Sequence, residues 1–205
     1  MPADALDELD AVAARARHSL STSSERDFVD FVLGLNRDTL FDDLLEPGAR
    51  REVGSWLRFS ERAAAERRDG FSPSALGFPG PLLHAYFRLA PAFELPGLRH
   101  AIRRLYFRTM RGTSTIAWFN GPFDEHADWV AAGRLLGRSW LLLTKHSVVL
   151  HPFGSIITNK RANAALHERI GRDEAGRTTW LIARLGYSAE PPRSQRLEAR
   201  ELIVD

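Results

Sequence analysis

The stretch TWLIARLGYSAEPPRSQR, Thr179 to Arg196, joins an apolar run to a cationic turn. Residues 178–185 are apolar and carry aromatic and β-branched side chains, which predicts a β-strand. Pro191 and Pro192 then fix the backbone and hold Arg196 in one place. A guanidinium held in this way suits a phosphate group, which it can bind with two parallel hydrogen bonds. A structural turn followed by a solvated basic tail is the competing interpretation.

A second stretch, VVLHPFGSIITNK, places a tight turn directly after another short apolar run. Residues 147–150 predict a buried strand, and the turn after it would leave backbone N–H groups exposed. A planar ligand that accepts hydrogen bonds could dock there, although a purely structural turn explains the pattern equally well. The turn consists of His151, Pro152, Phe153, Gly154 and Ser155.

The first half of the sequence predicts helices. Hydrophobic spacing indicates helices over 4–20 and 25–42, a third from Pro47 to about Arg68, and a fourth that begins at Pro96. Three prolines and three glycines between residues 69 and 83 indicate an ordered loop or lid. The helix after Pro96 should bury a face of Leu98, Ile102, Leu105 and Phe107 or Tyr106.

The second half predicts the strands and the longest helix. We expect strands over 113–119, 147–150 and 178–185, and helices over 125–147 and 160–171. The helix over 125–147, with Asp124 as its N-cap, is apolar nearly all round, so it should be central and buried. Helices dominate and the strands are few, which predicts an α+β fold with helices around a small mixed or antiparallel sheet. We expect a single domain over 1–205, with residues 1–45 helical or flexible.

Composition limits the class of protein. The 205 residues are 44% hydrophobic and 26% charged with a net charge of +2, as expected for one ordinary globular core. The absence of cysteine excludes disulfides and thiol catalysis. The acidic first ten residues do not resemble a signal peptide, and no apolar run is long enough to span a bilayer. We therefore expect a cytoplasmic protein without a membrane segment.

No catalytic or metal-binding motif stands out. The seven histidines form neither an i, i+4 pair nor an HExxH frame, so no metal site is expected. Phosphate-binding glycine motifs and a nucleophile-elbow spacing are also missing from the sequence. The basic stripe over 99–111 leaves nucleic-acid binding as a minor alternative, but no recognition motif accompanies it.

The ordered set of motifs resembles the C-terminal half of nitroreductase-like flavoproteins. That family has a long G-R-x-x-x-R-x-W-L helix, a strand leading to a proline-containing turn, and a closing R-x-G-Y-x-x-x-P-P-x-S-x-R. This sequence carries these pieces in GRLLGRSWL, SVVLHPFGS and RLGYSAEPPRSQR. An earlier segment, RREVGSWLRFSERAAAERRDG, resembles one that larger members carry, with its W-x-R and R-D-G pieces. The resemblance covers roughly residues 50–196.

The resemblance implies a flavin mononucleotide (FMN) site and an oxidoreductase. The turn over 151–155 would lie along the isoalloxazine ring, with the backbone N–H groups of Phe153 and Gly154 facing flavin N5 and O4. Arg196 and Arg193 would bind the FMN phosphate. Hydride would pass from NAD(P)H through the flavin to a nitro, quinone or similar acceptor, without a catalytic acid or base. The family also implies a homodimer, in which the long helix with Gly133 and Gly137 packs centrally.

One departure from the family opens an alternative. Members normally carry an early arginine-rich R-R-S phosphate-binding segment and a Pro-x-x-x-N-x-Q stretch that lines the flavin, and this sequence has neither. The chain resembles the later portion of a larger member, so it is a fragment, needs a partner chain for the missing half of the site, or has lost flavin binding. Alternatively, it is a non-catalytic relative that sequesters flavin or binds a partner.

Overall fold

The computed structural model of the chain describes residues 3–171, 176–190, 192 and 195–202. Contacts divide the chain into two compact units. The first comprises Met1–Leu40 and Leu105–Ser188, and the second comprises Phe41–Arg104 and Ala189–Asp205. The expectation of one domain over 1–205 stays a prediction.

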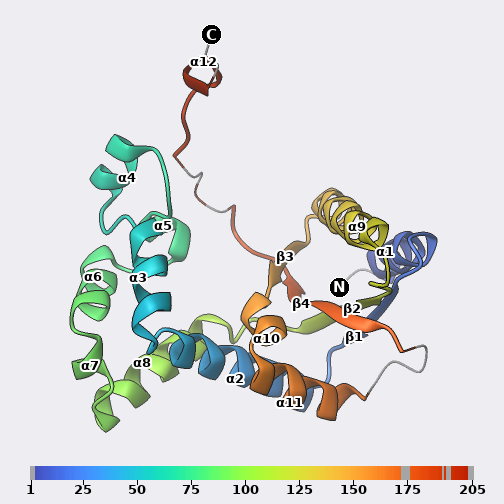
Figure 1. The fold of residues 1–205 in the computed structure, drawn as a ribbon, viewed down its shortest axis with the longest axis horizontal. Helices are drawn as coiled ribbons and strands as arrows, with labels where there is room; N and C mark the ends of the chain where they lie inside the picture. The colour runs from blue at the N-terminus through green and yellow to red at the C-terminus, as the bar shows by residue number, and fades with distance from the viewer. Residues whose placement is uncertain (1–2, 172–175, 191, 193–194, 203–205) are drawn as a thin grey trace. The chain divides into compact units, whose positions relative to one another are not determined.

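Within the described residues, the first unit is built on a four-stranded antiparallel sheet with the order β1-β2-β4-β3 (Figure 1). The strands are β1 (Ser19–Ser23), β2 (Thr115–Gly121), β3 (Val149–Pro152) and β4 (Thr178–Gly186). Strand β4 is central and pairs with β2 on one side and β3 on the other. The strand predicted over 178–185 is therefore confirmed, and it organises the sheet.

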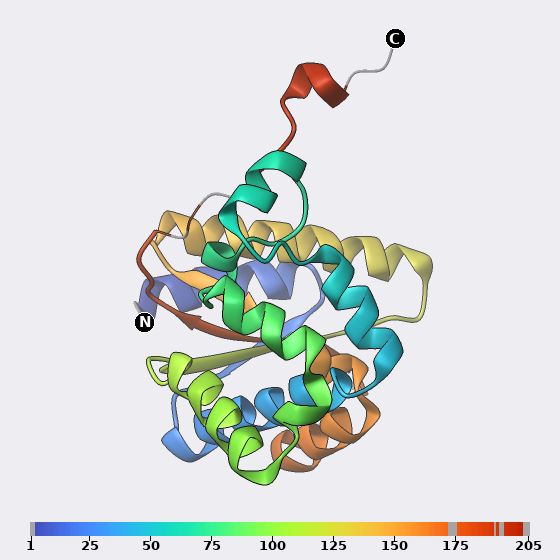
Figure 2. The ribbon, with the colours of Figure 1, turned by 90° about the vertical axis from the view of Figure 1, so that its left-hand side faces the viewer.

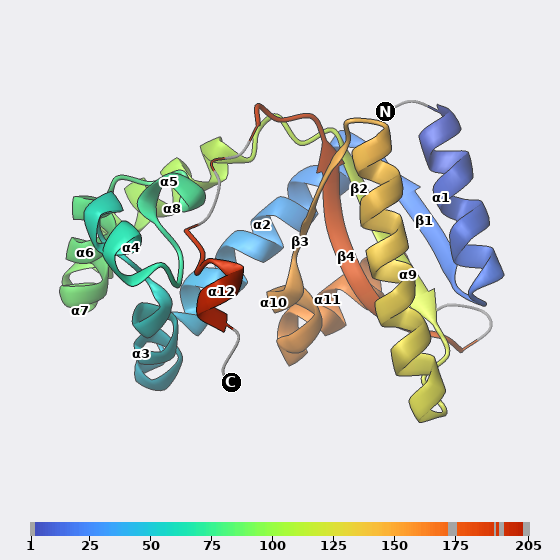
Figure 3. The ribbon, with the colours of Figure 1, turned by 90° about the horizontal axis from the view of Figure 1, so that it is seen from above.

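Helices cover both faces of this sheet, as Figures 2 and 3 show. One face packs against α1 (Ala3–Arg15) and α9 (His126–Lys145), and the other against α2 (Arg26–Asp43), α10 (Gly154–Thr158) and α11 (Lys160–Ile170). Successive residues of a strand point to opposite faces. In β4, Ala183 therefore joins the core beneath α9, and Ile182 joins the core beneath α2 and α11.

The sequence did not predict strand β1. A helix was expected over 4–20, but α1 ends at Arg15, and Arg17 has a positive φ of 64°. The following residues pair with β2, with Leu20 opposite Phe119. Four of the five β1 residues are serine or threonine, so the strand carries no apolar alternation, and pairing with β2 decides its conformation. Strands are therefore not confined to the second half of the chain.

Helix α9 is not buried all round as its sequence suggested. Its buried residues are Ala132, Leu135, Ser139 and Leu143, which form one stripe against the sheet. On other sides, Trp129 is 65% exposed and Leu141 is 75% exposed. Glu125 is the N-cap in place of Asp124, and Asp128 completes a capping box with it. An all-apolar sequence is compatible with a buried helix, but it does not show that the same chain covers every side of that helix.

The second unit is helical in its described residues. Its elements are α3 (Pro47–Trp56), α4 (Glu61–Arg67), α5 (Pro73–Leu76), α6 (Gly80–Arg88), α7 (Ala90–Phe93) and α12 (Ala199–Leu202), together with most of α8 (Pro96–Thr109). The single helix predicted from Pro47 to Arg68 is divided, because the Ser60 side chain caps a new helix by accepting the Ala63 N–H at 3.1 Å. The predicted loop over 69–83 contains α5 and the start of α6.

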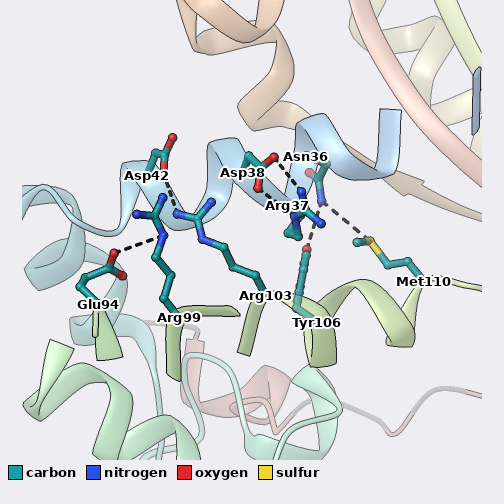
Figure 4. Close-up of polar contacts among 9 residues, drawn as sticks. All are labelled: Asn36, Arg37, Asp38, Asp42, Glu94, Arg99, Arg103, Tyr106 and Met110. Atoms are coloured by element: carbon teal, nitrogen blue, oxygen red, sulfur yellow. Dashed lines mark hydrogen bonds and ion pairs between the residues drawn. The ribbon is translucent and has the colours of Figure 1, made fainter. Parts of the chain in front are cut away.

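Helix α8 begins at Pro96 as predicted, but its buried face was predicted correctly only for Ile102, Tyr106 and Phe107. Leu98 and Leu105 are 40% and 46% exposed, whereas Tyr106 is partly buried. In the first unit, the Asn36 amide donates to the Tyr106 hydroxyl at 3.1 Å, as Figure 4 shows. In the second unit, Arg103 contacts Asp42 at 2.7 Å. These polar contacts therefore supplement the packing of Tyr106 and Phe107 against the core of the first unit. None of the described helices is long and apolar enough to cross a membrane.

Candidate functional site

The turn between β3 and α10 is anchored by Phe153. Strand β3 lies at the edge of the sheet, where Pro152 is tolerated because no further strand needs its missing N–H. The Phe153 side chain is 1% exposed, and its backbone N–H donates to the Ile182 carbonyl of β4 at 2.8 Å. The Phe153 N–H is therefore engaged within the protein. This corrects the expectation that it faces a ligand.

Gly154 presents the open backbone of this turn. A Cβ added at Gly154 would meet no atom within 4 Å, so the space above its backbone is free. Gly154 and Ser155 are also the first two residues of α10, where a helix supplies no acceptor for the N–H groups. Of the backbone donors predicted from the sequence, the Gly154 N–H therefore remains the candidate for a ligand contact.

His151 faces an arginine that the sequence analysis did not single out. His151 on β3 and Arg184 on β4 are direct cross-strand partners. The His151 ring also lies at 5.5 Å from the Phe153 ring in an edge-on arrangement. Arg184 belongs to the otherwise apolar run Trp180–Leu185, and a lone charge in such a run is the signal that could have identified it.

The pKa values of His151 and Arg184 are both lowered by their surroundings. Burial lowers the pKa of Arg184, and the electrostatic interaction with Tyr106 raises it by a smaller amount. Although His151 has solvent-exposed surface, the surrounding protein disfavours its charged form, so desolvation lowers the pKa of His151 and the Arg184 cation lowers it further. A neutral imidazole therefore lies beside a partly buried cation.

Both residues line a cavity of about 280 Å³ in the first unit. Its wall combines the ends of β3 and β4 with the segment that follows α8. Thr113, His151, Arg184 and Tyr187 are among its lining residues. The volume lies near the lower limit of small-molecule sites, which is roughly 300 Å³.

The described structure does not place the two predicted phosphate-binding arginines relative to this turn. Arg193 lies outside the described residues. Arg196 is described and exposed, but it belongs to the second unit, whereas the turn over 151–155 belongs to the first. Their roles therefore remain predictions. No group of three or more histidine, cysteine, aspartate or glutamate side chains that could hold a metal ion occurs in the described parts of the chain.

Comparison with known proteins establishes the fold. No protein-family model and no curated protein matches the sequence. Among solved structures, a nitroreductase with bound FMN from Bacteroides fragilis matches with a TM-score of 0.54 and 12% identity, covering 100% of this chain and 88% of its own. A nitroreductase with bound FMN from Desulfitobacterium hafniense matches with a TM-score of 0.50 and 13% identity, again over 100% and 88%. The chain therefore has a nitroreductase-like, helix-rich α+β fold, as its motifs predicted.

Proposed function

We propose that this chain is an FMN-dependent oxidoreductase of the nitroreductase type. It would pass hydride from NAD(P)H through the flavin to a nitro, quinone or similar acceptor. The observation that carries the proposal is the open backbone at Gly154, which lies at the turn named by the family motif, in a fold shared with two structures that hold FMN. In this proposal the backbone of Gly154 and the open space above it would accommodate the flavin, and no side chain at position 154 takes part.

In this proposal the turn over 151–155 contacts the flavin ring and two arginines contact the phosphate. The Gly154 N–H would donate to the polar edge of the flavin ring, while the Phe153 N–H, which donates to the Ile182 carbonyl, attaches the turn to β4. His151, Pro152 and Ser155 would flank the ring, and Arg196 and Arg193 would bind the phosphate. When bound, the flavin supplies the hydride chemistry, so the protein needs to provide orientation and electrostatics only.

A homodimer through α9 belongs to the same proposal. Trp129, Val130 and Leu141 leave large apolar side chains exposed on this helix. A Cβ added at Gly133 or Gly137 would meet no atom within 4 Å, so another backbone could approach there closely. Exposed apolar surface of this kind marks an interaction site. A complementary partner chain is the alternative occupant of this helix face.

Flavin reconstitution tests the proposal. The purified chain is mixed with micromolar FMN, passed through a desalting column, and its visible spectrum is recorded. We expect retained, shifted flavin absorbance that NADH or NADPH bleaches under anaerobic conditions. Loss of all flavin on the column, both for the chain alone and with a partner encoded by a neighbouring gene, would contradict the proposal.

A second candidate function is supported by the sequence. Because the R-R-S and Pro-x-x-x-N-x-Q segments are missing from it, the chain could keep the fold and hold flavin without turnover. Flavin that stays bound through desalting and is reduced by neither NADH nor NADPH would favour this non-catalytic, flavin-sequestering role.

A further inference from the structure

Among the described residues, Arg184 is a partly buried arginine that, unlike Arg58 and Arg103, has no anionic partner. The side chain of Arg58 is 6% exposed and pairs with Asp69 at 2.7 Å, and that of Arg103 is 12% exposed and pairs with Asp42 at 2.7 Å. Arg184 lies in the central strand of the sheet, and within the described residues no carboxylate pairs with it.

An unpaired, partly desolvated cation is costly to a fold. Removing a charge from water without a compensating partner is strongly unfavourable, so buried charges are normally paired. An apolar residue at position 184 would continue the pattern of Ile182 and avoid this cost. A cation that a fold retains in such a position, on the wall of a cavity, is a candidate for ligand binding.

The groups around Arg184 are donors rather than anions. Thr113 is 7% exposed and lines the same cavity, and its hydroxyl has no hydrogen-bond partner among the described residues. His151 stands opposite Arg184 in the sheet, and the Tyr106 hydroxyl, which lies within electrostatic reach, already accepts from Asn36. None of these groups can neutralise the charge of Arg184, whereas a negatively charged ligand could.

We propose that this cavity binds an oxyanion, the carboxylate or phosphate group of a small molecule, held by the guanidinium of Arg184 with His151 and Thr113 beside it. The planar guanidinium matches both anions because each offers two oxygens to its paired N–H donors. The anion can come from two sources, a separate small molecule or the phosphate of FMN itself. The inference does not require the flavin function, because the donors belong to the first unit alone.

Anion titration of the flavin-free chain tests the site. Sodium phosphate and sodium benzoate are titrated by calorimetry at constant ionic strength, with wild type, Arg184→Gln and Arg161→Gln compared. Arg161 is an exposed arginine on α11 and serves as the matched control. We expect saturable binding of at least one anion to wild type, a loss of roughly tenfold or more in affinity in Arg184→Gln, and no change in Arg161→Gln. Equal affinities in the three proteins would overturn the proposal.

A wild-type measurement covers the case in which Arg184→Gln does not fold. The ring proton signals of His151, assigned with His151→Gln, are followed by NMR as phosphate or benzoate is added. A bound anion beside His151 should shift these signals along a saturable curve, while the signals of His100, an exposed histidine on α8, stay in place. Signals of His151 that do not respond to either anion would overturn the proposal.

Competition identifies the source of the anion. If FMN displaces bound phosphate and riboflavin does not, the cavity holds the phosphate of FMN. If neither displaces it, the cavity holds a separate small anion. Because these titrations begin with the flavin-free chain, failure to retain FMN would remove the proposed oxidoreductase function and leave the oxyanion site standing.

Discussion

Arg58 and Asp69 form an ion pair in which Arg58 Nε lies 2.7 Å from Asp69 Oδ1. The pair joins the residue that follows the C-cap of α3 to the residue that follows the C-cap of α4. Two backbone hydrogen bonds run beside it, from Arg58 N to Phe71 O and from Phe71 N to Trp56 O, both at 2.9 Å. The W-x-R and R-D-G pieces, which carried part of the family resemblance, therefore meet in space. Their role in this chain is structural.

Gly70 is the position at which this junction should tolerate least change. It has a φ of +67°, and an added Cβ would lie 2.2 Å from the Trp56 carbonyl oxygen. Gly70→Ala should lower the free energy of unfolding by roughly 3 kcal/mol, because left-handed strain and a backbone clash add together. Gly77→Ala is the matched control, since Gly77 has a φ of +69° and open space around it. Urea denaturation should show a loss of only about 1 kcal/mol there. Equal losses would contradict the clash.

Asp69 should make the stability of the chain sensitive to acid. The Arg58 guanidinium, with a smaller contribution from Arg67, lowers the pKa of Asp69. The ionised carboxylate therefore stabilises the fold above its unfolded pKa of about 3.9, and this contribution is lost as the pH falls through the lower folded value. Asp69→Asn should be less stable than wild type at pH 7, and the difference should shrink in acid. Urea denaturation at both pH values measures this. Asp10→Asn, at an exposed carboxylate on α1, should follow wild type throughout.

Arg196 provides a direct test of the proposed phosphate contact. Arg196→Ala should weaken FMN binding roughly tenfold or more and leave riboflavin binding unchanged, because only FMN carries the phosphate. Fluorescence quenching of either flavin measures both affinities. Arg200→Ala is the matched control, since Arg200 is an exposed arginine further along the same tail. If Arg196→Ala weakens FMN and riboflavin equally, the phosphate role is excluded.

Leu141 tests the dimer proposed through α9. A charge at this 75% exposed leucine would be desolvated in a helix-to-helix interface, so Leu141→Glu should yield monomers. Leu141→Met keeps the face apolar and should keep the assembly of wild type. Size-exclusion chromatography with light scattering measures the mass of each. A wild-type chain that is monomeric at high micromolar concentration would contradict the homodimer.

The elements that the sequence predicted well carry their own local signals. Helix α2 presents Phe28 and Val32 at helical spacing on one face, and both are buried. Helix α11 ends at Ile170 and is capped by Gly171, whose φ of +78° is one that glycine adopts without strain. Apolar, β-branched strand β4 was likewise visible in its composition. In each case, the residues within a few positions decide the conformation.

What the sequence could not predict depends on distant partners. Strand β1 is polar and exists because Leu20 lies opposite Phe119, nearly a hundred residues later. The free face of α9 depends on which helices the chain supplies to cover it. The pairing of His151 with Arg184 follows from the strand order, which places β3 beside β4. For this reason the sequence indicated the turn over 151–155 and missed the cation beside it.

Helix α1 limits how the chain can be trimmed for crystallisation or fused to other proteins. Ala5, Leu9 and Ala13 are each fully buried, and Lys145 of α9 reaches Glu8 at 3.0 Å. The helix belongs to the core that contains Leu135 and Leu143. Removing α1 would expose that core to water and leave an aggregating product. Shortened versions of the protein must keep this segment intact.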